Sequence, residues 1–165
     1  MTADTTRRRA AVTLPSDTQI RITRSFDAPR QRLWKAWTTP ELIKRWWHAK
    51  RGTATVADVD LRPGGRWRWA MVTHAGAEVA FHGAYREVVP PERLVYTEVF
   101  EGAPEGEDDP VVVTVTFNER DGRTTATMLM DAPNREVRDI IIQSGMEGGL
   151  QDALELLEEV ARSLP

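Results

Sequence analysis

The chain has 165 residues, of which 41% are hydrophobic and 28% are charged. This length suits one domain with a sizeable core, and the composition is that of a folded protein rather than a disordered one. The formal net charge is -3 with both signs spread along the chain, which excludes the basic footprint of a nucleic-acid-binding protein. The absence of cysteine excludes disulfides, thiolate metal sites and cysteine nucleophiles.

The N-terminal segment carries no export or membrane signal. The arginines at positions 7–9 are followed only by Ala10, Ala11 and Val12, too short a run for the apolar core of a signal peptide. No apolar stretch approaches the roughly 18 residues that a membrane helix needs. We therefore expect a cytoplasmic protein without membrane insertion, in which residues 1–16 form a disordered leader and residues 17–165 a single domain.

The front of the domain reads as one strand followed by two short helices. Ile20 and Ile22 alternate with polar residues, which is typical of a strand with one buried face. The Asp-Ala-Pro segment at 27–29 begins a first helix, because the first turn tolerates proline. The Thr-Pro-Glu segment at 39–41 begins a second helix, with its carboxylate at the positive end of the helix dipole.

Between residues 54 and 130 the hydrophobic period is two, which predicts a succession of further strands. Turn signals separate them, among them Pro63-Gly64-Gly65 and Asp121-Gly122. The second is a hairpin signal, because both central residues of a type I′ turn need a positive φ. The acidic segment 101–110 reads as a solvated loop. Together with the first strand this predicts an antiparallel sheet of about seven strands.

The segment from Met146 to Leu164 has the spacing of a long amphipathic helix. Burying its apolar stripe contributes on the order of 10 kcal/mol before the entropy cost, and the sheet is the surface large enough to cover it. The sequence therefore predicts an α+β fold in which a curved antiparallel sheet surrounds the C-terminal helix. The other face of the sheet, richer in threonine and arginine, is expected to meet water.

A twisted sheet around one helix rarely closes without a gap, so we predict an internal cavity that binds a small hydrophobic or amphipathic molecule. Methionine and tryptophan suit its walls, since one is flexible and the other is large and flat. The alternative is that the same residues are plain core. The predicted ligand-binding residues are Trp46, Trp67, Trp69, Met71, Phe81, Tyr85, Tyr96, Glu98, Val113, Val115, Met128, Met130, Met146, Leu150 and Leu154.

Glu98 is the polar residue of most interest, because a period of two places it on the same face as Tyr96 and Phe100. A carboxyl group in an apolar pocket has a raised pKa, and it can act as a general acid or base or anchor a ligand. Glu98 and Tyr96 are therefore candidate catalytic residues for cyclase or hydratase chemistry. The alternative places Glu98 at the open end in water, or in a pair with Arg68 or Arg86.

No other catalytic or cofactor motif is recognisable. The histidines lack the short spacing of metal ligands, and neither a nucleotide-binding glycine loop nor a nucleophile elbow occurs, so we expect no metal and no cofactor. We prefer binding to catalysis, with a protein-interaction module as a further alternative. A monomer and a homodimer both remain open, because an edge strand can pair with a second copy.

Several motifs occur in a characteristic order along residues 20–164. They are Arg24-Ser25-Phe26-Asp27-Ala28-Pro29, Trp34, Trp46-Trp47, the Asp-Leu-Arg-Pro-Gly-Gly-Arg-Trp segment at 60–67, Gly83, and the segment from Glu87 to Thr97. In this order they resemble the activator-of-heat-shock-protein-90-ATPase-like family of the START-like (SRPBCC) superfamily. The resemblance implies a helix-grip fold.

The superfamily includes lipid and hormone binders, polyketide cyclases and a co-chaperone domain, so the resemblance leaves the activity open. It also points to one departure from the family pattern. Relatives commonly carry a tryptophan near the start of the last helix, where this chain has Gly148 and Gly149. We expect the missing side chain to loosen the first turn or to leave space that enlarges the pocket mouth.

Overall fold

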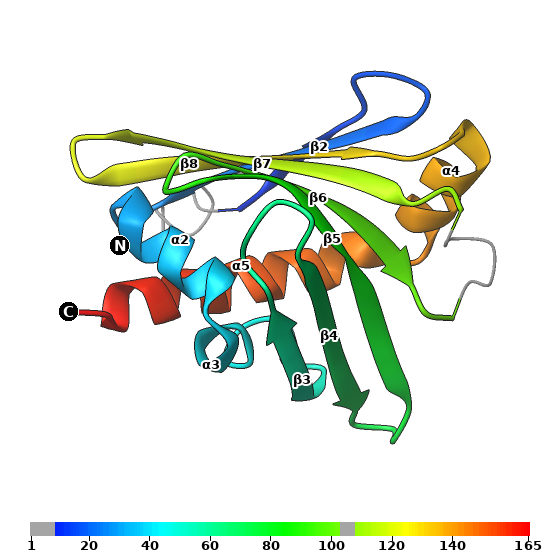
Figure 1. Cartoon of the computed structure of the whole chain (residues 1–165), viewed down its shortest axis with the longest axis horizontal. Helices are drawn as coiled ribbons and strands as arrows, with labels where there is room; N and C mark the ends of the chain where they lie inside the picture. Colours follow the sequence, from blue (N-terminus) through cyan, green and yellow to red (C-terminus); the bar gives the residue numbers. More distant parts are fainter. Residues whose placement is uncertain (1–8, 103–107) are drawn as a thin grey trace.

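The structure is a computed structural model that describes residues 9–102 and 108–165. In these residues an antiparallel sheet curves around a C-terminal helix (Figure 1). The strands are β1 (Ala11–Thr13), β2 (Gln19–Phe26), β3 (Gly52–Val59), β4 (Arg66–Thr73), β5 (Glu78–Val89), β6 (Arg93–Phe100), β7 (Val111–Arg120) and β8 (Arg123–Asp131). The helices are α2 (Arg30–Thr38), α3 (Pro40–Ile43), α4 (Arg135–Gln143) and α5 (Met146–Ser163). The predicted α+β helix-grip fold is confirmed.

The sheet has the order β1-β2-β8-β7-β6-β5-β4-β3, and every neighbouring pair is antiparallel. It contains eight strands within the described residues rather than about seven. The additional strand is β1, which pairs with β2 through Ala11 and Thr23. The prediction of a disordered leader is therefore wrong for residues 11–13, whose short run shows no alternation to reveal a strand. Residues 1–8 of that leader lie outside the described residues.

The turn between β7 and β8 follows the sequence signal closely. Asp121 and Gly122 have φ values of 55° and 76°, as the central residues of a type I′ turn require. This turn fixes the register of the β7–β8 hairpin, which pairs Val113 with Met130 and Val115 with Met128. These side chains consequently share the concave face of the sheet.

Two features of the helices differ from the sequence prediction. The second helix was expected to carry Trp46 and Trp47 on its buried face, but α3 ends at Ile43 and both residues lie in the turns that follow it. Helix α4 was not predicted; it begins after Asn134, whose side chain accepts a hydrogen bond from the backbone N–H of Val137 at 2.9 Å. Its apolar residues are only partly covered, with Ile140 59% exposed.

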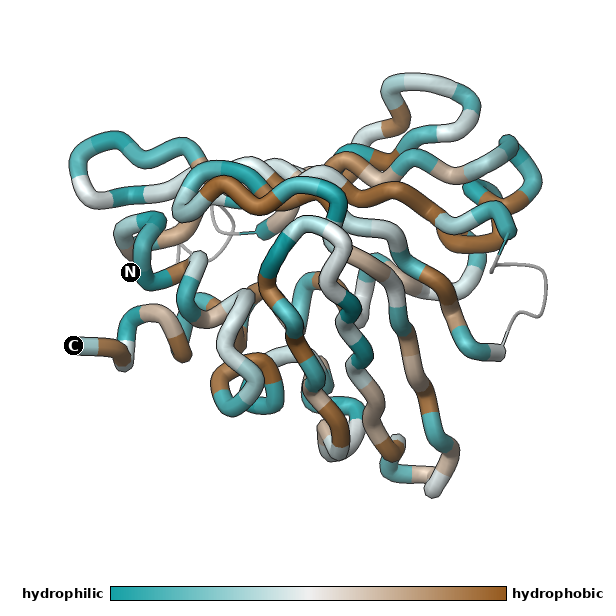
Figure 2. Tube along the Cα trace, viewed as in Figure 1, coloured by the Kyte–Doolittle hydropathy of each residue, from teal (hydrophilic) through white to brown (hydrophobic). Residues whose placement is uncertain are grey.

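Helix α5 lies along the concave face of the sheet, as Figure 1 shows. Its buried side chains, among them Leu154 and Leu157, join Ile22, Val115 and Phe117 from the strands in one hydrophobic core. Figure 2 shows hydrophilic and hydrophobic residues alternating along several strands, because successive side chains point to opposite faces. The helix therefore covers one face and leaves the other to solvent, as the sequence predicts.

Candidate ligand-binding site on the concave face

The concave face of β4, β5 and β6 is lined by aromatic side chains. The register sets Trp69 opposite Phe81 and Tyr85 opposite Tyr96 across neighbouring strands. The Trp67 ring packs against Trp69 at a centroid distance of 5.2 Å and against Tyr96 at 5.5 Å, both with rings edge-on. Edge-to-face contacts of this kind are the favoured geometry of aromatic pairs and hold the rings in place.

Tryptophans from α2 and from the turns after α3 add to these aromatic side chains. Trp37 on α2 packs against Trp46 at 5.2 Å, and Trp46 packs against Trp69 at 5.9 Å. Trp47 contacts both Trp69 at 5.9 Å and Phe81 at 6.1 Å. We call the whole set the aromatic cluster; its members are Trp37, Trp46, Trp47, Trp67, Trp69, Phe81, Tyr85, Tyr96 and Phe100.

A small void lies inside the aromatic cluster. Its volume is about 10 Å³, which is close to the minimum that holds one water molecule. It is far smaller than the roughly 300 Å³ of a typical small-molecule pocket. Its lining residues are Trp37, Trp67, Trp69, Tyr85, Leu94 and Tyr96. Four of these were predicted; Trp37 and Leu94 were missed, because the strand pattern does not reveal that α2 reaches β4 and β6.

The buried tryptophans differ in their hydrogen bonds. The indole Nε1 of Trp46 donates to the Ala36 carbonyl at 3.0 Å, and that of Trp67 donates to the Thr97 carbonyl at 3.1 Å. Within the described residues, the buried Nε1 of Trp69 has no hydrogen-bond partner. The buried Nε1 of Trp37 has no partner of good geometry, although Trp37 still acts on the Tyr96 side chain as a hydrogen-bond donor. A buried donor without a partner costs about 1–3 kcal/mol. The fold therefore carries one clearly unsatisfied donor, on Trp69.

Glu98 points to the concave face, because it pairs with Val111 and lies two residues from Tyr96 on β6. Its side chain is partly buried, and among the described residues its carboxyl oxygens are not among the buried polar atoms that lack a partner. Burial raises the pKa of Glu98 to about 7. Burial, followed by the charge of Glu98, also raises the pKa of Tyr96. The catalytic use of these two residues stays a prediction.

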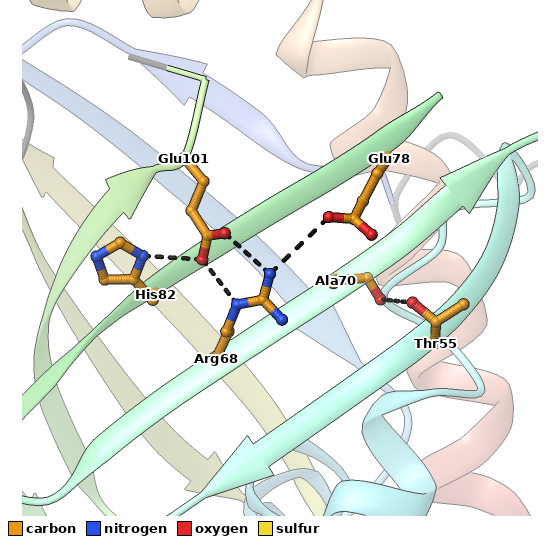
Figure 3. A network of polar contacts seen from close by, with 6 residues as sticks. All are labelled: Thr55, Arg68, Ala70, Glu78, His82 and Glu101. Atoms are coloured by element: carbon orange, nitrogen blue, oxygen red, sulfur yellow. Dashed lines mark hydrogen bonds and ion pairs between the residues drawn. The ribbon is translucent and has the colours of Figure 1, made fainter. Parts of the chain in front are cut away.

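The alternative partners considered for Glu98 are not its partners in the structure. Arg68 lies on the opposite, outer face of the sheet, where its Nε and Nη2 atoms each donate to Glu101 at 2.9 Å (Figure 3). His82 Nδ1 lies 2.9 Å from the same carboxylate. The hydrogen bond from Arg68 is the main reason that the pKa of Glu101 falls to about 2. A pairing of Glu98 with Arg68 is therefore wrong, and the described residues show no hydrogen bond or ion pair between Glu98 and Arg86.

The same outer face contains a groove of about 440 Å³, which the sequence did not predict. The alternation of side chains along β4 and β5 could have indicated this groove, because Arg66, Arg68 and His82 all lie on the face opposite to Trp67 and Trp69. Its lining residues are Arg66, Trp67, Arg68, His82, Gly83, Ala84, Thr97, Val99, Glu101 and Pro110.

The other predicted ligand-binding residues divide into two groups. The first group is buried in the core between β7, β8 and α5, as the alternative that these residues are plain core describes. Its members are Val113, Val115, Met130 and Leu154. Met71 and Phe81 on β4 and β5 share the face of the aromatic cluster, and Met128, Met146 and Leu150 are partly buried against the core. A ligand-binding role for any of them stays a prediction.

The two glycines near the start of α5 do not leave an open space. A methyl group on Gly148 would lie 3.2 Å from the Arg51 guanidinium, and one on Gly149 would lie 3.3 Å from it. Arg51 also forms an ion pair with Asp152 at 3.4 Å. The expectation that the glycines enlarge the pocket mouth is therefore wrong, since Arg51 from the segment before β3 occupies the space beside them.

The part of the chain that the structure describes has no helix long and apolar enough to cross a membrane. In the same residues no three histidine, aspartate or glutamate side chains come together as a metal site.

Residues 27–162 match the family model described as "Activator of Hsp90 ATPase homolog 1-like protein". The chain belongs to this family. The match runs from the residues before α2 to the last turn of α5, so it includes the aromatic cluster and Glu98. This confirms the resemblance found in the sequence. No curated protein matches the chain.

Solved structures with the same fold cover nearly the whole AHSA1-like chain. A protein from Rhodobacter sphaeroides has a TM-score of 0.86 at 24% identity, with coverage of 94% of this chain and 99% of that one. A protein from Mycobacterium smegmatis has a TM-score of 0.82 at 27% identity, with coverage of 94% and 98%. An HSP90 activator from Plasmodium falciparum has a TM-score of 0.66 at 21% identity, with coverage of 87% and 95%.

Proposed function

We propose that this AHSA1-like protein binds a small amphipathic molecule on the concave face, beside Glu98. The observation that carries the proposal is the carboxyl group of Glu98, which is partly buried between Tyr96 and Phe100 on the concave face of β6 and has a raised pKa. A carboxyl group that has lost part of its water gains from a hydrogen-bond partner. A bound ligand would supply such a partner.

The charge state of Glu98 restricts the class of ligand. With a pKa of about 7, the carboxyl group is half protonated at neutral pH and can donate or accept a hydrogen bond. A neutral or cationic head group is compatible with both forms. An anionic head group would oppose the ionised form in surroundings of low dielectric constant. We therefore infer that neutral and cationic amphiphiles bind better than fatty-acid anions.

We infer that the apolar part of such a ligand enters near the end of β6. Phe100 at this end is 44% exposed and packs against Phe81 with ring centroids 5.2 Å apart. Figure 1 places the end of β6 and helix α4 at the same end of the sheet, and Ile142 of α4 is 38% exposed. Because the void is small, binding requires side chains to move, and flexible methionines such as Met71 and Met146 allow this at low cost.

The test uses three amphiphiles with the same decyl chain, namely an amide, an amine and a carboxylate. Tryptophan fluorescence gives the affinities, and native mass spectrometry of gently purified protein reports any bound molecule. We expect the amide and the amine to bind more tightly than the carboxylate at pH 8, and Glu98→Gln to reduce that difference. Glu78→Gln is the matched control, since the side chain of Glu78 is 67% exposed on the outer face. Absence of binding by all three amphiphiles contradicts the proposal.

A protein-interaction function is the second candidate, and the small internal void favours it. A void of about 10 Å³ offers no ready space for a ligand, whereas the outer-face groove measures about 440 Å³. The structurally similar protein from Plasmodium falciparum is an HSP90 activator. Binding to purified HSP90, measured by calorimetry and weakened by Arg66→Ala on the groove but not by Glu98→Gln, would favour this function over the first.

A further inference from the structure

We propose that residues 47–51, in the connection from α3 to β3 (Figure 1), form a lid that opens the aromatic cluster by releasing Trp47 to solvent. In the structure the lid is closed and its backbone is strained. In the open form the backbone relaxes and Trp47 leaves its ring contacts. The exchange between the two forms is a property of the ligand-free protein, whereas the use of the opening by a ligand rests on the proposed function.

The backbone of the lid is strained at two successive residues. Ala49 and Lys50 have φ values of 54° and 61°, which lie in the left-handed region that favours glycine. Among the described residues, Asp121 is the other non-glycine residue with a positive φ, and aspartate tolerates this conformation in turns. Backbone strain persists only where the surroundings enforce it, and it is concentrated in ligand clamps and switch regions. The lid is therefore the segment in which we expect a second backbone conformation.

Contacts near the surface hold Lys50 in its strained conformation. Its backbone N–H donates to His48 Nδ1 at 3.1 Å, and its carbonyl oxygen lies 3.1 Å from His74 Nε2. Its Nζ pairs with Glu155 on α5 at 3.3 Å, and the two side chains of this ion pair are 49% and 57% exposed. Exposed ion pairs contribute little to stability. Contacts of this kind can be lost without unfolding of the core, so the lid can open locally.

Trp47, at the start of the lid, packs on the aromatic cluster. Its ring lies 5.9 Å from that of Trp69 and 6.1 Å from that of Phe81, both edge-on, and the side chain is only partly buried. The preceding residue, Trp46, is held firmly, because it is 3% exposed and its Nε1 donates to the Ala36 carbonyl at 3.0 Å. The boundary between the fixed part of the chain and the lid therefore falls between Trp46 and Trp47.

Release of Trp47 would open a space next to the small void. Trp69 lines this void, and both Trp69 and Phe81 would lose the ring that packs against them. A buried tryptophan covers roughly 150–250 Å², so its departure leaves room for a ring or a short chain of a ligand. The void alone, at about 10 Å³, is too small for either. The lid thus supplies a movement that binding on the concave face requires.

Opposing effects balance the open and closed forms. Opening relieves the strain at Ala49 and Lys50 and frees the conformations of the Trp47 side chain. It also gives up the ring contacts of Trp47 and exposes apolar surface to water. A ligand that fills the space left by Trp47 binds the open form only, and it therefore shifts the population toward that form.

Opening is tested in the ligand-free protein, labelled with 5-fluorotryptophan. Trp47→Phe and Trp46→Phe assign the two fluorine signals. We expect the Trp47 signal to show conformational exchange in relaxation-dispersion and saturation-transfer experiments, since lids move on timescales of microseconds and longer. The signal of Trp46, which is bonded to Ala36, should show none. Absence of exchange at Trp47 overturns the inference, whatever the ligands do. If Trp46→Phe does not fold, the Trp47 signal decides by itself.

The role of strain is tested by comparing Lys50→Gly with Lys50→Ala. Neither variant can form the ion pair with Glu155, so the two differ in the backbone freedom at position 50. Glycine adopts a positive φ without steric cost and should stabilise the closed lid. We therefore expect the open population of Lys50→Gly to be about fivefold smaller than that of Lys50→Ala.

The matched control compares Lys44→Gly with Lys44→Ala. Lys44 has a φ of -63° at the end of α3, where glycine relieves no strain, so these two variants should have the same open population. An open population of Lys50→Gly that equals or exceeds that of Lys50→Ala contradicts the inference.

The use of the lid by a ligand is tested with the decyl amide. If the ligand enters through the open form, its association rate follows the open population, so it should associate about fivefold more slowly with Lys50→Gly than with Lys50→Ala. Stopped-flow tryptophan fluorescence measures both rates. Equal rates contradict entry through the lid while the proposed function stands. Failure of all the decyl amphiphiles to bind contradicts the proposed function, and the fluorine experiment on Trp47 then decides on the lid by itself.

Discussion

Arg24 on β2 and Glu158 on α5 form an ion pair inside the contact between the sheet and the last helix. Arg24 Nη1 lies 3.4 Å from Glu158 Oε2, and the two side chains are 5% and 8% exposed. The same Glu158 oxygen accepts a hydrogen bond from the backbone N–H of Asp27 at 2.9 Å. The Arg24 guanidinium also lies 4.5 Å from the centre of the Phe26 ring. The pair therefore ties α5 to the strand that leads into α2.

Removing one partner of this pair should be strongly destabilising, because the other charge is left buried. We expect Glu158→Ala to lower the free energy of unfolding by about 3 kcal/mol or more. Glu155→Ala is the control on the same helix, since Glu155 pairs with Lys50 at 3.3 Å with side chains 57% and 49% exposed, and should cost less than about 1 kcal/mol. Urea unfolding measures both; equal losses would show that burial of the pair does not matter.

Stability should depend on pH through Glu98. The folded protein keeps this proton up to about pH 7, whereas the unfolded chain, with a pKa of 4.5, releases it earlier. Stability therefore falls as the pH rises from about 4.5 to about 7 and stays lower above that range. Glu98→Gln should remove this loss and raise stability at pH 8 by up to about 3 kcal/mol. Urea unfolding at several pH values measures it.

The exposed residue Glu147 provides the control for Glu98. Glu147→Gln should leave the pH dependence of the wild-type protein in place. A carbon-13 titration of the Glu98 carboxyl group checks the cause directly, and a midpoint near 4.5 would contradict the prediction.

The low pKa of Glu101 should depend on Arg68. The two hydrogen bonds from Arg68 favour the ionised carboxylate, so Arg68→Ala should move the pKa of Glu101 upward from about 2 toward 4.5. In the wild-type protein this contact stabilises the fold above about pH 4.5 and is lost as the pH falls through about 2. Arg66→Ala, two residues along the same face, should leave the carbon-13 titration of Glu101 unchanged. An unchanged midpoint in Arg68→Ala would contradict the assignment.

Two glycine substitutions should have opposite effects on stability. Gly83→Ala should destabilise the protein by more than about 2 kcal/mol, because the new methyl group meets backbone oxygen of Thr97 at 1.8 Å. Gly148→Ala should be neutral or stabilising by up to about 1 kcal/mol, because its contact is the flexible Arg51 side chain at 3.2 Å and alanine favours the helix. Thermal unfolding distinguishes them. A Gly83→Ala variant as stable as the wild-type protein would contradict the first prediction, because β5 and β6 could then move apart without loss of stability.

Much of the fold follows from patterns that lie within a few residues of each other. The alternation in β4 and β6 places Trp67, Trp69, Tyr96 and Glu98 on the concave face, and the Asp-Gly pair at 121–122 forms the expected turn. The long apolar stripe of α5 must be buried for the helix to be stable, and it packs against the concave face of the sheet. These signals are local, because a strand or helix periodicity depends only on the backbone geometry of its own segment.

The sequence by itself determined which side chains face inward, but only the tertiary structure decided how much space they leave. Trp37 on α2 lines the same small void as Trp69. Arg51 occupies the space beside Gly148. Glu158 is buried, although the spacing of α5 places it on the polar side of the helix. Each of these depends on the curvature of the sheet and on the approach of segments distant in the chain. The periodicity of one helix or strand determines in which direction each side chain points. The packing between elements determines the distances between those side chains, and a binding site depends on both.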